Sequence, residues 1–356
     1  MKNFTKSFLI VILVILLGIA GLLGWLTMTE FSPNPIEPLE PLSNQAVAVL
    51  PQEASLDLLS WNIGYAGLGA GSDFIMDGGQ NVRSADESTV RRYLKEIEAV
   101  AKSGEYDLVI LQEVDTDSAR TFSIDQASRL AFGTSYHALN FSCPFVPNPK
   151  TLLYDPIGKV NSGLLTSSNY RIDKAERISL PCPFTWPLRI ANLKRCLLVS
   201  YLPIEGSDSQ LVLINLHLEA YDDGEGKLAQ TRQLQEFIES EYQKGNYVIA
   251  GGDFNQVFPR SLERYPNNHP DLWAPGVLEE TMLPEEAGWM FVSDSKTPTC
   301  RLLNQPYDPA DTVNTQYYVI DGFIISPNVQ LELVETLDLG FENSDHNPVH
   351  LRVVLR

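Results

Sequence analysis

The chain has 356 residues, 44% of them hydrophobic and 20% charged, which excludes an intrinsically disordered protein and allows one large domain or two ordinary ones. Its formal net charge of −19 argues against a protein that holds nucleic acid through many phosphate contacts. An enzyme that meets one phosphate through a metal ion is still compatible with this charge.

The N-terminal residues predict a membrane anchor. Residues 8–27, FLIVILVILLGIAGLLGWLT, carry no charge and are long enough to span the hydrocarbon core of a bilayer, about 30 Å. A cleaved signal peptide is the alternative, but its apolar stretch is usually shorter, and no A-x-A cleavage pattern follows here. Trp25 stands where an interfacial aromatic is expected, and Lys2 and Lys6 favour a cytoplasmic position for residues 1–7. We therefore expect a single-pass signal-anchor in the cell membrane and an extracytoplasmic body.

Residues 28–53 are rich in proline and predict an extended, semi-rigid spacer that holds the body off the membrane. Residues 54–356 have a globular texture without repeats or a second linker, so we expect one domain there. The cysteines, at positions 143, 182, 196 and 300, form no CxxC or zinc-knuckle pattern. One or two disulfides and four buried thiols both stay open.

The predicted elements of the body alternate between strands and helices. A strand at 56–62 and an apolar strand at 106–114 flank a helix in 84–104, which has a capping box of Ser84 and Glu87. A hairpin of 194–202 and 210–220 follows, then an amphipathic helix at 227–245 and a strand at 246–255. Strand candidates at 317–326 and 329–339 follow, and the run after the proline in SDHNPVHLRVVLR, residues 344–356, closes the chain. This order predicts an α/β or α+β sandwich.

Polar side chains stand where several apolar runs stop. They are Asn62, Glu113, His217, Asp253, Asn255, Asp321, Asp345 and His346. Each one alone has an ordinary explanation, because Asp and Asn terminate strands and form turns. Together, from six separate segments, they suit a hard divalent cation with oxygen ligands. No HExxH or cysteine pattern for zinc is present.

The blocks LQEV, GGDFN and SDHNPV, with WN, NLHLEA and VIDGF in the expected intervals, resemble the endonuclease/exonuclease/phosphatase superfamily over about 54–356. This resemblance implies the deoxyribonuclease I-like fold: a four-layer α/β/β/α sandwich of the α+β class, here preceded by one transmembrane helix. It also implies cleavage of phosphodiester or phosphomonoester bonds with Mg²⁺, with Mn²⁺ as an alternative.

The resemblance further implies a role for each polar residue. Glu113 is expected to be the principal metal ligand. Asn62 is expected to be a ligand or a phosphate contact, and Asp345 is expected to lie near the ion. Asp253 is expected to hold the attacking water and Asn255 the phosphate oxygens. His346, with Asp321 on its other ring nitrogen, is expected to contact the scissile phosphate, and His217 a non-bridging oxygen or the leaving group. The turn at 344–347 lets Asp345 and His346 face different partners.

The sequence departs from the family pattern at two places, and these departures limit which branch of the family and which phosphate contacts are expected. Asn62 is followed by Ile63 and Gly64 where the abasic-site DNA repair branch has an Asp, which argues against that branch. Residues 318–320 lack the basic residue that usually precedes Asp321. Three segments, 64–83, 140–150 and 256–296, are expected to wall the cleft and select the substrate.

We therefore expect a membrane-tethered, Mg²⁺-dependent phosphodiesterase or phosphatase, with a small-molecule or lipid phosphate ester favoured over nucleic acid as substrate. Two alternatives stay open. One is an extracytoplasmic endonuclease or exonuclease, because a local basic groove is enough for nucleic acid. The other is a catalytically inactive module that binds a ligand in the same cleft. No protein partner is predicted.

Overall fold

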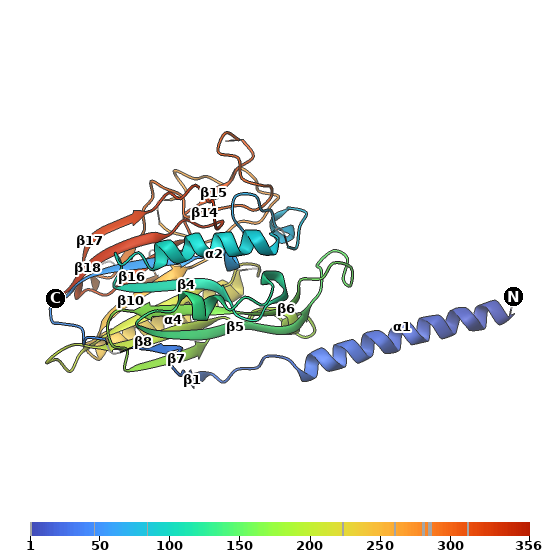
Figure 1. Ribbon diagram of the computed structural model, residues 1–356, viewed down its shortest axis with the longest axis horizontal. Coiled ribbons are helices and arrows are strands. Elements are labelled where there is room, and N and C mark those ends of the chain that lie inside the picture. The colour runs from blue at the N-terminus through green and yellow to red at the C-terminus, as the bar shows by residue number, and fades with distance from the viewer. Residues whose placement is uncertain are drawn as a thin grey trace.

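The computed structural model describes residues 2–45, 47–83, 85–222, 224–259, 261–279, 282–283, 287–311 and 313–356. Within this part of the chain, two seven-stranded sheets pack face to face and helices cover their outer faces (Figure 1). This is the four-layer α/β/β/α sandwich that the resemblance predicted, preceded by one long helix.

The first sheet has the strand order β1-β7-β8-β9-β10-β16-β13. These strands are β1 (Ile36–Pro38), β7 (Lys174–Ser179), β8 (Cys196–Pro203), β9 (Gln210–His217), β10 (Tyr247–Asp253), β16 (Asp321–Ile325) and β13 (Met290–Val292). The second sheet has the order β17-β18-β3-β4-β6-β5-β2. Its strands are β17 (Val329–Thr336), β18 (Val349–Leu355), β3 (Ser55–Asn62), β4 (Leu108–Asp115), β6 (Gly158–Ser168), β5 (Thr134–Val146) and β2 (Ser43–Asn44).

The remaining elements are helices and two short strand pairs. The helices are α1 (Lys2–Met28), α2 (Glu87–Ala101), α3 (Gln126–Leu130) and α4 (Glu225–Gln243), with 3-10 turns at Gly64–Ala66, Ile75–Asp77, Ala119–Thr121 and Leu188–Ala191. The pairs are β11 (Gln256–Val257) with β12 (Gly276–Val277) and β14 (Cys300–Arg301) with β15 (Tyr317–Tyr318). The strand predicted at 317–326 is therefore two strands, and Asp321 begins the second one.

Three apolar clusters hold the layers together. The central cluster joins the inner faces of both sheets through residues such as Leu58, Ile110 and Leu213. A second cluster packs α4 on the first sheet, and a third packs α2 and α3 on the second sheet. Because both faces of the central strands are covered, their sequences are nearly continuous apolar runs.

Two parallel strand pairs position the ends that matter for function. β3 pairs in parallel with β4, and β9 pairs in parallel with β10. Parallel neighbours require a crossover, and α2 and α4 supply it in the two sheets. The carboxyl ends of all four strands can therefore meet at one end of the sandwich.

The start of α2 differs from the predicted capping box. The helix begins at Glu87, and the Asp86 carboxylate caps it by accepting a hydrogen bond from the Thr89 backbone N–H. Ser84 lies outside the described residues. Asp and Ser are similarly good N-caps, so the sequence pattern did not distinguish the two positions.

The prediction that residues 28–53 form a spacer that holds the body off the membrane was wrong. In the structure this segment lies along the body, where β1 pairs with β7, β2 pairs with β5, and Leu50 is fully buried in the central core. Proline does not prevent this, because an edge strand leaves one side of its backbone without ladder hydrogen bonds. All four cysteines are free thiols, with Cys182 half-buried and the others buried.

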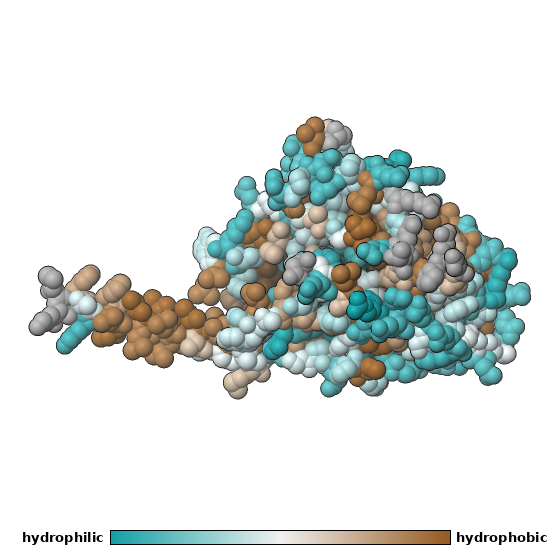
Figure 2. Space-filling view, turned by 180° about the vertical axis from the view of Figure 1, so that it is seen from behind, coloured by the Kyte–Doolittle hydropathy of each residue, from teal (hydrophilic) through white to brown (hydrophobic). Residues whose placement is uncertain are grey.

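Helix α1 projects from the body as an isolated rod with an apolar surface (Figures 1 and 2). Phe4–Met28 is long and apolar enough to cross a membrane, and a signal sequence can have the same length and composition. The C-terminal end of the helix is built into the body. The Trp186 indole N–H donates to Thr27 Oγ1 at 3.1 Å, and Arg189 and Lys194 pair with the Glu30 carboxylate at 2.8 and 3.2 Å.

Candidate active site

The strand ends bring the predicted polar residues to one place. In the first sheet, Asp253 at the end of β10 lies opposite His217 at the end of β9 and opposite Asp321 at the start of β16. Residues paired across adjacent strands share a face of the sheet, so these three side chains point the same way. Asp321 reaches this end because β16 runs antiparallel to β10.

In the second sheet, a β-bulge directs Glu113 into the site. The pairing of β4 with β6 shifts register between Leu111 and Val114, and Glu113 within this bulge has a φ of 55°. A bulge re-aims a side chain that a regular strand would place elsewhere. A left-handed conformation is uncommon for a residue other than glycine and persists where the surrounding structure over-determines it.

Asn62, at the end of β3, connects carboxylates from the two sheets. Its amide nitrogen donates to Glu113 Oε1 at 3.2 Å and to Asp253 Oδ2 at 3.0 Å. Its amide oxygen accepts the backbone N–H of Gly64 at 3.0 Å. Since a backbone N–H can only donate, this contact sets the orientation of the amide. Asn62 therefore presents its nitrogen, and not its oxygen, to the two carboxylates.

The adjacent residues Asp345 and His346 face different partners, as the turn allows. His346 Nδ1 is 2.8 Å from Asp321 Oδ2, whereas its Nε2 is 4.0 Å from Asp345 Oδ2 and 3.8 Å from Asp253 Oδ2. The Trp61 indole donates to the His346 backbone carbonyl at 2.8 Å and holds the turn against β3. The Asp321 carboxylate thus fixes the orientation of the His346 ring.

The last two predicted residues join the same network through Asp253. His217 Nε2 lies 3.4 Å from Asp253 Oδ2, and His217 Nδ1 is buried with no partner among the described residues. The Asn255 backbone N–H donates to Asp253 Oδ1 at 2.8 Å, and its side-chain amide donates to Leu218 O. All eight residues named from the sequence thus form one connected group, although they come from segments that lie far apart in the chain.

Burial and crowding of charge shift the pKa values in this group. Burial, with the Asp321 carboxylate nearby, raises the pKa of Asp253 to about 7. Burial also raises the pKa of Asp345 to about 6, opposed by His346 and reinforced by Glu113. Burial lowers the pKa of His346, but Asp321 and Cys300 outweigh it and hold that pKa well above its usual value. Burial and the Arg195 cation hold the pKa of His217 well below its usual value.

The site can hold a divalent cation. Asp253, Asp321 and His346 offer ligand atoms within 4.8 Å of one another. In that trio, however, the hydrogen bond between Asp321 and His346 already occupies one atom of each. Glu113 and Asp345 also line the cavity, and no Lys or Arg of the described residues lies within ion-pair distance of either carboxylate. Two neighbouring carboxylates that no Lys or Arg neutralises are the oxygen donors that Mg²⁺ binds.

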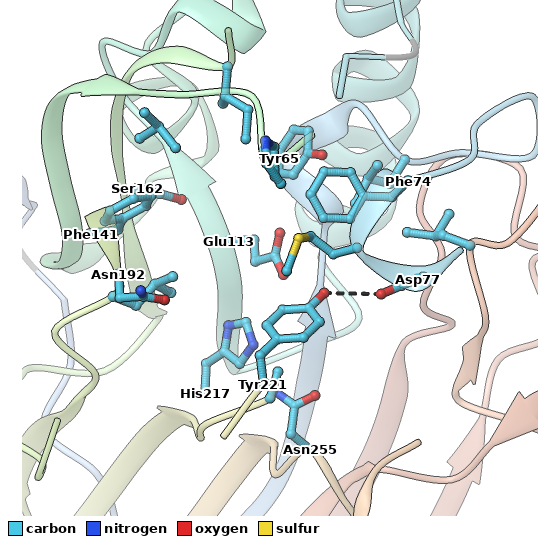
Figure 3. Close-up of a pocket in the computed structure, with 18 of the residues that line it drawn as sticks. Tyr65, Phe74, Asp77, Glu113, Phe141, Ser162, Asn192, His217, Tyr221 and Asn255 are labelled. Carbon is cyan, nitrogen blue, oxygen red and sulfur yellow. Dashed lines mark hydrogen bonds between the residues drawn. The ribbon is translucent and has the colours of Figure 1, made fainter. Parts of the chain in front are cut away.

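A cavity of about 500 Å³ opens above these residues, and three predicted segments form its walls. Phe74 and Asp77 come from 64–83, Phe141 from 140–150, and Trp273 from 256–296. Figure 3 shows Glu113 and His217 between Phe141 and Asn192 on one side and Phe74 and Tyr221 on the other. The cavity therefore has a polar base and largely apolar walls.

Several lining residues were not predicted from the sequence. Arg195 is buried, its Nε lies 3.8 Å from the Glu219 carboxylate without a hydrogen bond, and its Nη1 donates to His217 O at 3.4 Å. The hydroxyl of Tyr221 donates to Asp77 Oδ1 at 3.1 Å on the Phe74 side of the cavity (Figure 3). Tyr221 follows an apolar strand, so the strand-end signal could have identified it, whereas Arg195 precedes a strand and carried no such signal.

Comparisons with known proteins agree with this architecture. The Endonuclease/Exonuclease/phosphatase family matches residues 59–346. A solved endonuclease/exonuclease/phosphatase from Beutenbergia cavernae DSM 12333 is similar, with a TM-score of 0.55, 16% identity and coverage of 85% of this chain and 72% of that one. ANGEL2, a 2',3'-cyclic phosphatase solved with adenosine-2',3'-vanadate, is similar with a TM-score of 0.50, 15% identity and coverage of 85% and 96%.

A search of curated proteins found no match. The solved structures are distant in sequence and show the fold alone, whereas the family match extends from β3 to the turn that carries His346. Members of this family are typically hydrolases that act on phosphoester bonds, and they generally depend on a divalent metal. This chain belongs to the endonuclease/exonuclease/phosphatase family.

Proposed function

We propose that the chain is a Mg²⁺-dependent phosphohydrolase that cleaves a phosphodiester or phosphomonoester, with Mn²⁺ as an alternative ion. One observation supports this most directly: Asn62 connects Glu113 and Asp253 across the two sheets, directly beside the pair of His346 and Asp321. Carboxylates and imidazoles that converge at the base of a cavity are the groups that phosphate-ester hydrolysis needs.

Glu113 and Asp345 hold the metal ion in this proposal. When bound, such an ion neutralises phosphate charge and polarises the phosphoryl group. Asn62 acts as a positioning residue, because its nitrogen fixes Glu113 and Asp253 while its oxygen is bound to Gly64 N–H. This refines the expectation that Asn62 is itself a ligand.

Asp253 orients the attacking water and accepts its proton. Its pKa of about 7 suits a general base that works near neutral pH. The water oxygen forms a bond to phosphorus, and the bond between phosphorus and one ester oxygen breaks. The leaving oxygen then takes up a proton, which gives an alcohol and a phosphate with one ester bond fewer.

The two histidines act on the phosphate in different protonation states, one as a cation and one as a neutral imidazole. His346 is held as a cation by Asp321, so its Nε2–H stabilises the negative charge that grows on the phosphoryl oxygens. His217 is neutral and donates one N–H to a non-bridging oxygen or to the leaving group. Asn255 and the buried Arg195 complete the set of donors that line the cavity.

The proposal places the catalytic body outside the cytoplasm, with α1 retained as a single-pass anchor. The contacts of Thr27 and Glu30 with the body support retention, because cleavage within the helix would free groups that the body holds. Lys2 and Lys6 ahead of the apolar stretch support the outward orientation. Protease added to intact cells should digest the body and leave α1 protected.

A substrate screen with and without chelator tests the activity. We expect purified full-length chain to hydrolyse bis-p-nitrophenyl phosphate or p-nitrophenyl phosphate with Mg²⁺, and Glu113→Ala and His346→Ala to abolish this while the fold is retained by circular dichroism. Turnover of plasmid DNA alone would establish the nuclease alternative. A folded chain without turnover of any ester would support the inactive binding module.

A further inference from the structure

Five large apolar side chains stand exposed on two loops that both line the cavity. Leu152, Leu153 and Tyr154 lie in the 147–157 loop between β5 and β6, and Trp186 and Leu188 lie in the 180–195 segment between β7 and β8. Their exposed fractions run from 53% to 80%. We call these five residues the apolar rim. An exposed apolar cluster of this kind marks a contact surface for a protein or a membrane.

The rim is attached to the end of α1. Trp186 donates its indole N–H to Thr27 Oγ1, and Arg189 in the same segment pairs with Glu30. A helix rises about 1.5 Å per residue, so the 25 residues of Phe4–Met28 cover the thickness of the hydrocarbon core and bring Thr27 to its boundary. A bilayer that contains α1 therefore lies against Trp186.

The surface around the apolar rim also favours contact with a membrane. The β5–β6 loop extends from the body on the side from which α1 leaves (Figure 1), and apolar surface interrupts the mostly hydrophilic body on that side (Figure 2). Tryptophan and tyrosine favour the interface between water and hydrocarbon, and leucine favours the hydrocarbon itself. The composition of the rim thus suits a membrane surface better than a polar protein partner.

The same two loops form one wall of the catalytic cavity. Leu152 and Ile157 line it from the first loop, and Leu188 and Leu193 line it from the second. The cavity thus extends from the polar base at Glu113 and His217 to apolar side chains next to the rim. An amphiphile with a phosphate at one end and a hydrocarbon chain at the other matches this distribution of polarity.

We propose that the substrate is a membrane glycerophospholipid, and that the apolar rim contacts the bilayer that anchors α1 so that the lipid enters the cavity directly from it. This inference rests on the proposed phosphohydrolase function. The phosphodiester lies at the polar base, and the proximal part of the acyl chains lies against the leucines of the two loops. Insertion of exposed apolar side chains into the bilayer is favourable because it removes their apolar surface from water.

Reconstituted full-length chain tests this proposal with two substrates in one preparation. Vesicles of phosphatidylethanolamine and phosphatidylglycerol with Mg²⁺ report lipid hydrolysis by mass spectrometry, and added bis-p-nitrophenyl phosphate reports the chemistry alone. Leu153→Glu with Tyr154→Glu alters the rim at two residues outside the cavity lining. We expect phospholipid turnover to fall at least tenfold while bis-p-nitrophenyl phosphate turnover stays within twofold.

Val313→Glu is the matched control. Val313 is exposed to a similar extent, 77%, in the loop between β14 and β15, which Figure 1 places on the edge of the body away from α1. We expect this variant to hydrolyse both substrates as the parent does. Equal phospholipid turnover by the rim variant and the control would overturn the rim contact.

A fluorescence measurement tests the contact without reference to turnover. An environment-sensitive nitrobenzoxadiazole label on Tyr154→Cys should shift to the blue in vesicles and be quenched by spin-labelled lipid, whereas the same label on Val313→Cys should not. The labelled parent chain serves as background for the half-buried Cys182. A solvent-like spectrum at position 154 would overturn the contact even where the rim variant had lost both activities.

The two proposals fail in distinguishable ways. Hydrolysis of bis-p-nitrophenyl phosphate without hydrolysis of either phospholipid would overturn the lipid substrate and leave the phosphohydrolase intact. A folded chain that hydrolyses no ester with Mg²⁺ or Mn²⁺ would overturn the phosphohydrolase itself.

Discussion

Glu113 stands in the bulge of β4 with a left-handed backbone, and its carboxylate faces the cavity beside Asp345. A residue of this kind is under two constraints, one on its backbone conformation and one on the position of its carboxylate. A conformation that costs on the order of 1–3 kcal/mol persists because the pairing on both sides of the bulge maintains it. The carboxylate keeps its position because Asn62 donates a hydrogen bond to its Oε1.

We predict that Glu113→Gln lowers kcat by about 10²–10³-fold, since loss of one charge contact at a transition state typically has this effect. Steady-state kinetics with bis-p-nitrophenyl phosphate measures it. Glu53→Gln is the matched control, because Glu53 also has a left-handed backbone, φ 51°, but is exposed to solvent. The metal role of Glu113 is wrong if both variants keep the parent's kcat.

Asp77 gives a prediction on stability against pH. Burial and the Asp345 charge raise its pKa to about 7, although its hydrogen bond from Tyr221 opposes the shift. Below pH 3.8, the pKa of the carboxyl in the unfolded chain, the group is protonated in both states. Its stabilising contribution to the folded state is then fully present. Between pH 4 and 7 only the folded state binds the proton, so this contribution to stability is lost as pH rises through that window.

Asp77→Asn should therefore be more stable than the parent at pH 8, by about 1–3 kcal/mol, and close to it at pH 4. Asn keeps an oxygen that can accept the Tyr221 hydroxyl hydrogen. Urea unfolding in the presence of chelator at pH 4, 6 and 8 measures the difference, with the exposed Asp208→Asn as control. A constant difference at the three pH values would contradict this assignment.

At the scale of the elements, β4 and β9 are joined by a buried polar link between the two sheets. Asn215 on β9 accepts a hydrogen bond from Gln112 Nε2 at 2.8 Å and donates to the carbonyls of Leu111 and Leu165. Asn215 lies two residues before His217, so both side chains face the opposite sheet. The link therefore aligns the strand ends that carry Glu113 and His217.

We predict that Asn215→Ala lowers the free energy of unfolding by about 2–4 kcal/mol, because it removes three buried hydrogen bonds, one from Gln112 Nε2 and two to the carbonyls of Leu111 and Leu165. Urea denaturation measures this change. The exposed Asn267→Ala should change stability by less than about 0.5 kcal/mol. A similar small change at Asn215 would show that the sheets align without the link.

At the scale of the whole molecule, the site concentrates negative charge in a body that is already acidic. The formal net charge is −19, and Glu113, Asp253, Asp321 and Asp345 gather at one end of the sandwich. In this group His346 offsets part of the charge. A bound cation would relieve the remaining repulsion and thereby stabilise the folded state over the unfolded one.

Magnesium should accordingly raise the melting temperature of the chelator-treated protein. At a concentration 100 times its dissociation constant, an ion that binds only the folded state adds about 2.7 kcal/mol. Differential scanning calorimetry with and without Mg²⁺ measures the shift. Asp345→Asn should reduce it strongly, whereas Asp208→Asn should not, and an undiminished shift in Asp345→Asn would place the ion elsewhere.

Local pattern was enough for the central strands, for α2 and α4 and for the identity of the chemical groups, but it did not predict β5, β6 or β7. Apolar runs predicted the central strands, and the polar residues that follow them named all eight members of the network, because a strand end is where a costly polar side chain can reach a cleft. The motif blocks added the fold. The capping residue of α2 and the division of 317–326 into two strands were missed, since neighbouring positions there have similar propensities.

Other features depend on contacts between residues far apart in the chain, which no local pattern encodes. The amide orientation of Asn62 depends on Gly64 N–H, and the partner of His346 depends on β16 running antiparallel to β10. Residues 28–53 look like a spacer because proline-rich sequence is extended, yet both sheets offered open edges on which an extended chain can pair. Tertiary packing alone brought the end of α1, the apolar rim and the catalytic cavity to one side of the molecule.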